Sequence, residues 1–237
     1  MAKTKPCRDR SPGVCAIIFD FDGVILESND IKASVFSELF REWSEHLPAI
    51  LDLHWKLGGV CRYRKFDLIY RDILGLPLDE AEQRQLGQRF EALVAASIET
   101  CPFVPGALEF LTEYASRIPL FVVSGAPEAE LRAIVTRRGI AGYFTEVHGS
   151  PRAKTEIIAQ ILDRHRFDPA TVVFVGDSST DHEAARQAGL AFVGRLRPGR
   201  DNLFSPDTEV MADLSELGPR LARFGDQGRR PWTPPGR

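Results

Sequence analysis

The chain has 237 residues, of which 43% are hydrophobic and 27% charged, values that are ordinary for a soluble globular protein. Its formal net charge of -3 supplies no general attraction for nucleic acid. No apolar run approaches the roughly 18–20 residues that span a bilayer. We therefore expect neither a nucleic-acid-binding protein nor an integral membrane protein.

The N-terminus and the cysteines indicate the compartment. The first residues, MAKTKPCRDRSPG, are basic but lack the apolar stretch of a secretory signal. The four cysteines (Cys7, Cys15, Cys61 and Cys101) show no CxxC spacing and no accompanying histidine pair. This pattern argues against a zinc site and fits a reducing compartment, so we expect a cytoplasmic protein.

The first predicted element is a strand over residues 14–19, which ends abruptly at the sequence Asp20-Phe21-Asp22-Gly23. An unbroken apolar run of this length is typical of a central parallel strand with helices on both faces. The next segment is helical in pattern and leads to a proline-rich linker at residues 101–106. We expect an all-helical cap domain over residues 25–103 that overhangs the acidic pair. Its helices are predicted at 30–43, 49–57, 62–74 and 79–98.

Strands and helices alternate in the rest of the chain. Strands are predicted at 119–123, 171–175 and, with a weaker pattern, 190–194. Helices are predicted at 106–117, 128–138, 153–166 and 180–188. The alternation predicts an α/β fold with a doubly wound, Rossmann-like parallel sheet. The catalytic core would be discontinuous, over residues 1–24 and 104–217, and the arginine- and proline-rich residues 218–237 would form a mobile tail.

A side chain with useful chemistry follows each strong strand. Because ligands of open α/β sheets bind at the carboxyl ends of the strands, these side chains should converge at one edge. They are Asp20 and Asp22, then Ser124, then Asp177 with Asp181 just beyond it. Four carboxylates at one edge repel one another unless a divalent cation lies between them, and an all-oxygen ligand set suits Mg²⁺. A single aspartate at a strand end is often only a turn former or a helix cap, but this explanation is weak for the whole set.

Lys154 adds a cation to this group. It opens a predicted helix, where a positive charge opposes the helix dipole and gains no stabilisation from it. We therefore expect the Lys154 ammonium to pair with the carboxylates or with a bound phosphate.

In this order, the residues resemble the four motifs of the haloacid dehalogenase-like superfamily. The matching segments are Asp20-Phe21-Asp22-Gly23-Val24, Ser124-Gly125, Lys154, and Gly176-Asp177-Ser178-Ser179-Thr180-Asp181. The resemblance extends to about Leu217 and includes a helical cap after the first motif. It implies that Asp20 is a nucleophile that forms an aspartyl-phosphate, and that Asp22 is the general acid and base.

The same resemblance implies the other roles. Ser124, Gly125 and Lys154 would bind the transferring phosphoryl group. Mg²⁺ would be held by Asp20, by the backbone carbonyl of Asp22 and by Asp177, and Asp181 would either bind it or orient its ligands.

The cap segment at residues 57–66 carries the expected specificity determinant. Two glycines break a helix there just before a basic cluster, and a helix N-terminus with Arg62 makes an anion site. The segment resembles the specificity loop of phosphoglycolate phosphatase-like and β-phosphoglucomutase-like caps, in which a matching arginine contacts substrate. Arg64 and Lys65 are expected on a solvated face. The histidines, His54 among them, show no spacing of a dyad or metal site and are expected to be structural or exposed.

Asp22 directs the functional prediction, because dehalogenase and phosphonatase relatives lack a second aspartate at this position. We predict a Mg²⁺-dependent phosphatase, monomeric or weakly dimeric, that hydrolyses a small phosphorylated metabolite. One alternative is a β-phosphoglucomutase-like phosphosugar mutase, which is weakened by Lys32 at the position of a histidine in those relatives. The other is a catalytically silent binding module on the same scaffold.

Overall fold

The computed structural model describes residues 13–226 and contains one six-stranded sheet, in which every pair of neighbouring strands is parallel. The strand order is β3-β2-β1-β4-β5-β6. The strands are β1 (Ala16–Phe19), β2 (Leu120–Pro127), β3 (Glu146–Ser150), β4 (Val172–Gly176), β5 (Ala191–Arg195) and β6 (Glu209–Met211). The predicted doubly wound parallel sheet is therefore confirmed, with β1 at its centre.

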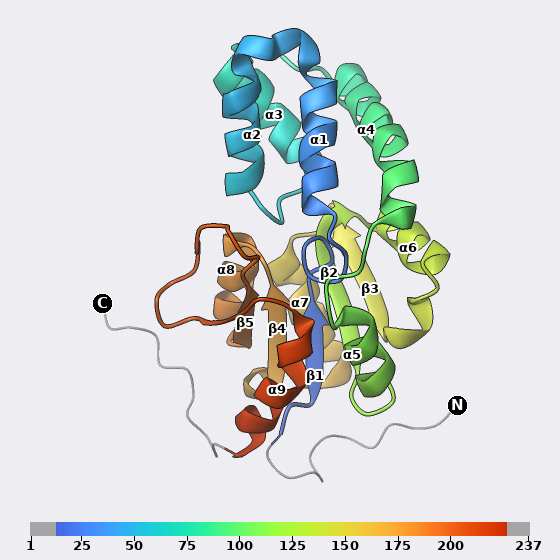
Figure 1. Ribbon diagram of the computed structural model, residues 1–237, viewed down its shortest axis with the longest axis vertical. Helices are drawn as coiled ribbons and strands as arrows, with labels where there is room; N and C mark the ends of the chain where they lie inside the picture. The colour runs from blue at the N-terminus through green and yellow to red at the C-terminus, as the bar shows by residue number, and fades with distance from the viewer. Residues whose placement is uncertain (1–12, 227–237) are drawn as a thin grey trace.

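Helices cover both faces of the sheet (Figure 1). On one face lie α5 (Ala107–Tyr114), α6 (Glu128–Arg137) and α9 (Leu217–Asp226); on the other lie α7 (Lys154–His165) and α8 (Ser179–Ala188). Alternate residues of β1 point to opposite faces of the sheet. Ile17 packs against the helices of the first face and Ile18 against those of the second. All four residues of β1 are buried, which explains the unbroken apolar run in the sequence.

The predicted helical cap is present, and Figure 1 shows its helices together at one end of the molecule. They are α1 (Asn29–Leu39), α2 (Leu47–Lys56), α3 (Arg62–Leu68) and α4 (Glu80–Thr100), with a 3₁₀ segment at Arg41–His46 and a π-helical turn at Ile69–Leu74. Aromatic rings fill the cap interior. The Phe36 ring centroid lies 5.8 Å from that of Phe66 and 5.4 Å from that of Phe90. These contacts join α1, α3 and α4 into one packed unit.

The two chain segments that connect the cap to the core lie side by side and are hydrogen-bonded. Leu26 and Phe103 form an antiparallel bridge. The backbone N–H of Glu27 donates to Pro102 O at 3.0 Å, and that of Val104 donates to Ile25 O at 3.0 Å. The cap is thus attached through a short two-stranded ladder, which we call the hinge ladder.

The structure differs from the sequence prediction in four elements. Strands β3 and β6 were not predicted, because β3 is a polar edge strand and β6 has only three residues. The helix predicted at 62–74 changes to π-helical geometry after Leu68. Residues 218–226 were expected in a mobile tail but belong to α9, which buries Leu217 and Leu221. The rest of that tail, residues 227–237, lies outside the described residues.

Two further findings concern the cysteines and the helices. Cys61 and Cys101 are free thiols. Within residues 13–226, no helix combines the length and the apolar character that a membrane crossing requires.

Candidate active site

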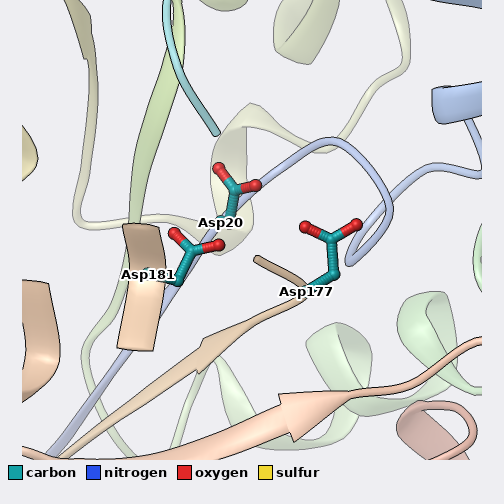
Figure 2. Close-up of side chains that lie close together, drawn as sticks. All are labelled: Asp20, Asp177 and Asp181. Carbon is teal, nitrogen blue, oxygen red and sulfur yellow. The ribbon is translucent and has the colours of Figure 1, made fainter. Parts of the chain in front are cut away.

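Three aspartates meet at the carboxyl edge of the sheet. Asp20 directly follows β1, Asp177 directly follows β4, and Asp181 lies in the first turn of α8. Each offers a carboxylate oxygen within 4.8 Å of the other two. Figure 2 shows the three carboxylates grouped around a common space. The topology explains this convergence, since β1 and β4 are adjacent and parallel.

Lys154 has the carboxylate partners that were expected of it. Its Nζ donates to Asp20 Oδ1 at 3.0 Å and to Asp181 Oδ1 at 2.5 Å. Burial disfavours the Lys154 ammonium, but the charges of Asp181 and Asp20 outweigh that effect and raise its pKa. The lysine is thus held as a cation between the nucleophile candidate and α8.

The electrostatics of the aspartates fit a divalent cation. Burial raises the pKa of Asp20 to about 7; Lys154 opposes this rise, whereas Asp181 and Asp22 add to it. Burial and the charge of Asp20 likewise raise the pKa of Asp177 well above its usual range. A cation among these oxygens would offset the repulsion between the carboxylates. The donor set is entirely oxygen, which suits a hard divalent cation such as Mg²⁺ or Ca²⁺.

The side chain of Asp22 is held by the cap. It accepts a hydrogen bond from Ser28 Oγ at 2.6 Å and forms an ion pair with Lys32, on α1. Burial disfavours the Asp22 carboxylate, but Lys32 and Ser28 outweigh that effect and lower its pKa. The sequence placed Lys32 near the site but gave no indication of this ion pair.

The predicted phosphate-binding residues lie directly beneath a loop of the cap. Ser124 is buried in β2, and its Oγ accepts a hydrogen bond from the backbone N–H of Ala126 at 3.2 Å. Gly125 faces the cap so closely that a Cβ there would lie 2.0 Å from Gly59 O. Thr180 Oγ1 donates to Gly58 O at 2.8 Å. The cap loop is therefore seated on the core through backbone atoms, and only glycine fits at position 125.

Arg62 lines the site, but its charge already has a partner. The guanidinium is buried and makes a bidentate ion pair with Glu130 of α6, with 2.7 Å between Nη1 and Oε2. Its Nε is buried without a partner among residues 13–226. Sequence reasoning missed Glu130, because an acidic residue in the first turn of a helix is also what a favourable helix dipole requires. The contact of Arg62 with substrate stays a prediction.

Cap and core enclose a cavity of about 330 Å³. The core side includes Asp20, Asp22 and Ser124, and the cap side includes Lys65 and His54. Lys65 was expected on a solvated face, but only 5% of it is exposed; its neighbour Arg64 is exposed, as expected. His54 is buried beside Lys65. The helical spacing of 62–66 could not show which of these basic residues faces inward.

The Arg62–Glu130 ion pair yields the first testable prediction. Glu130→Gln should lower the free energy of unfolding by about 2–4 kcal/mol, because it leaves the buried guanidinium without its counter-charge. Urea denaturation would measure the loss. Glu38→Gln is the control, since the Glu38–Arg41 pair is exposed and should change stability by less than about 0.5 kcal/mol. Equal effects of the two substitutions would contradict a stabilising contact between cap and core.

Comparison with known proteins agrees with this arrangement. A family model described as haloacid dehalogenase-like hydrolase matches residues 17–195. A phosphoglycolate phosphatase of Haemophilus influenzae is 31% identical over 188 residues, covering 74% of this chain and 83% of the relative. A phosphoglycolate phosphatase of Synechococcus elongatus is 28% identical over 198 residues, covering 75% and 82%.

The fold also matches solved structures. CbbY from Rhodobacter sphaeroides, solved in complex with phosphate, superimposes with a TM-score of 0.69 at 19% identity, covering 86% of this chain and 96% of CbbY. The family match spans the first strand, the cap and the motif after β4. The chain therefore belongs to the haloacid dehalogenase-like hydrolase family, as a phosphoric monoester hydrolase with an inserted helical cap.

Proposed function

We propose that the protein is a Mg²⁺-dependent phosphatase that hydrolyses a small phosphorylated metabolite through an aspartyl-phosphate on Asp20. The observation that supports this most is the group of Asp20, Asp177 and Asp181, in which Lys154 donates hydrogen bonds to Asp20 and Asp181. The closed cap supports a small substrate, because a cavity of about 330 Å³ beneath it leaves no room for a macromolecule. The two relatives named above are phosphoglycolate phosphatases, which places a phosphorylated small acid among the first compounds to test.

Asp20 would act as the nucleophile. Lys154 occupies its Oδ1, so the other carboxylate oxygen would attack phosphorus while the phosphate-ester bond breaks. Lys154, Ser124 and the backbone N–H of Gly125 would hydrogen-bond the phosphoryl oxygens as negative charge builds on them.

Asp22 would protonate the departing alkoxide and then take a proton from the water that hydrolyses the aspartyl-phosphate. The ion pair with Lys32 favours the carboxylate form, which is the form required for the second step. For the first step, Asp22 would take up a proton from solvent before the ester bond breaks. Ser28 holds the carboxylate from the other oxygen.

The residues that would hold Mg²⁺ are the carboxylates of Asp20 and Asp177 and the backbone carbonyl of Asp22. When bound, the ion would neutralise charge on the phosphate and on the carboxylates around it. Asp181 would fix the ligand geometry instead, since Ser178 Oγ and Lys154 Nζ already occupy its oxygens.

Metal removal tests this proposal. Chelation with EDTA should lower the turnover of p-nitrophenyl phosphate by at least about 100-fold, because an uncompensated cluster repels the dianionic substrate. Phosphate release would be measured before chelation, after it, and after Mg²⁺ is added back in excess. Full activity in a preparation shown to be metal-free by elemental analysis would contradict the assignment.

The mutase alternative is not better supported. Conversion of β-glucose 1-phosphate to glucose 6-phosphate without release of free phosphate would favour it over hydrolysis. The role of Arg62 is tested by Arg62→Ala on a panel of phosphometabolites. A selective loss for some substrates would place Arg62 in substrate recognition, whereas a uniform loss would restrict it to the ion pair with Glu130.

A further inference from the structure

The positively charged side chains that line the cavity differ in whether they have a carboxylate partner. Seven lysines and arginines line it, and within residues 13–226 six of them have a carboxylate at ion-pair distance. The six are Lys32, Lys56, Arg62, Arg195, Arg197 and Arg200. The seventh, Lys65, has no such partner in the described part of the chain. It is also among the most buried of the set, at 5% exposure.

Only neutral groups satisfy the Lys65 ammonium. Its Nζ donates to the carbonyl oxygen of His54 at 3.1 Å and lies 3.3 Å from His54 Nδ1. The Phe36 ring centroid lies 5.9 Å from the same nitrogen. Burial, followed by the charge of Lys65, lowers the pKa of His54 to about 3, so the imidazole is neutral and its Nδ1 can accept a hydrogen bond from Lys65. One of the three N–H bonds of Lys65 is left for another acceptor.

Holding this ammonium without a counter-ion is costly. Burial and the positive charge of Lys32 lower the pKa of Lys65 to about 7. The charges of Asp22, Asp177 and Cys61 act in the opposite direction but do not offset this shift. An apolar residue of the same length would fill the space without this penalty. A buried, unpaired charge in a cleft is therefore a candidate for ligand recognition.

We propose that Lys65 binds a second anionic group of the substrate, a carboxylate or a second phosphate, at the cap end of the cavity. This rests on the proposed function, since the cavity is the one that contains Asp20. The phosphate to be cleaved would lie at Asp20 in the core, while the second group lies on Lys65 in the cap. The substrate class that follows is a small phosphate monoester with an additional negative charge.

The test compares paired substrates, of which one member carries an additional negatively charged group. The pairs are ethyl phosphate with phosphoglycolate, glucose 6-phosphate with 6-phosphogluconate, and fructose 6-phosphate with fructose 1,6-bisphosphate. The first two pairs add a carboxylate and the third adds a phosphate, so they separate the two sources of charge over different molecular lengths. The wild-type protein should prefer the more anionic member of at least one pair by about 10-fold or more in kcat/KM.

Substitution of Lys65 should remove that preference. Lys65→Met should raise the KM of the preferred substrate by about 10-fold or more relative to the counterpart that lacks the second anionic group. Lys65→Arg should retain part of the preference. Lys56→Met is the matched control, because Lys56 is 70% exposed and paired with Asp52; it should keep the preference. If the wild type shows no preference in any pair, or if Lys65→Met keeps it, the proposal is wrong.

Two further measurements separate this proposal from the proposed function. Calorimetric titration of the same compounds into Asp20→Asn measures binding without hydrolysis. A chain that binds the anionic members through Lys65 but hydrolyses no ester would contradict only the proposed function. Lys65→Met should also raise the urea concentration at the unfolding midpoint, since it removes an unpaired buried charge. A lower midpoint would mark Lys65 as a structural residue and overturn the proposal.

Discussion

Asp20→Asn should lower kcat for every phosphate ester by about 10⁴-fold or more, because an amide cannot form the acyl-phosphate. The substitution preserves the shape of the side chain. It also removes one of the carboxylates that repel one another in the buried cluster, so the fold should not be destabilised. Phosphate release at saturating substrate measures the loss, and thermal unfolding confirms that the variant is folded.

Asp177→Asn is the matched control for this variant. It removes a proposed metal ligand from the same cluster but leaves the nucleophile in place. Raising the Mg²⁺ concentration should restore part of its activity, whereas it should restore none to Asp20→Asn. Borohydride reduction of the wild type during turnover should modify the peptide that contains Asp20, as detected by mass spectrometry. Modification at another aspartate, or turnover above about 1% in Asp20→Asn, would exclude Asp20 as the nucleophile.

Asp22→Asn should have an effect that depends on the leaving group. For an alkyl phosphate, we expect kcat to fall by about 10³-fold, since the departing alkoxide is strongly basic and requires a proton. For p-nitrophenyl phosphate the fall should be nearer to about 10-fold, because nitrophenolate leaves without protonation. Steady-state kinetics with a series of aryl and alkyl phosphates would measure the difference.

Ser28→Ala provides the comparison for Asp22→Asn. It removes one hydrogen bond to the Asp22 carboxylate, while the carboxylate and its ion pair with Lys32 remain. Its effect should be small and similar for all leaving groups. If Asp22→Asn also lowered kcat uniformly across the series, the role of Asp22 would be structural and the proposed proton transfer would be wrong.

The core of the site could be predicted because it depends on short-range sequence. Asp20 and Asp177 each follow a buried strand, and parallel strands of one sheet deliver such residues to the same edge. Lys154 was expected to pair with carboxylates because its place at a helix start disfavours a lone cation, and it contacts Asp20 and Asp181. In these cases, the position of the residue at the end of one strand or the start of one helix was enough to predict its place in the site.

The cap side of the site depends on how two units pack, and the sequence does not show this. In the sequence, Glu130 looks like an ordinary acidic residue in the first turn of a helix. In the structure, it forms the ion pair with Arg62 between core and cap. Lys65 reads as one of several basic residues on a short helix, yet it faces the cavity while Arg64 faces solvent. The same holds for Lys32, since its contact with Asp22 requires α1 to leave the hinge ladder in one particular direction.

The hinge ladder also has a mechanical consequence. Because the two connecting segments are hydrogen-bonded to each other, we expect the cap to move as one rigid lever about them. On such a path, the ammonium of Lys65 and the guanidinium of Arg62 return to the same positions at each closure. The cap could then open to exchange substrate and still close with its binding residues in the same orientation relative to the core. The accuracy of recognition would therefore be set partly by four residues, Ile25, Glu27, Pro102 and Val104, whose backbones carry the ladder and whose side chains need never contact substrate.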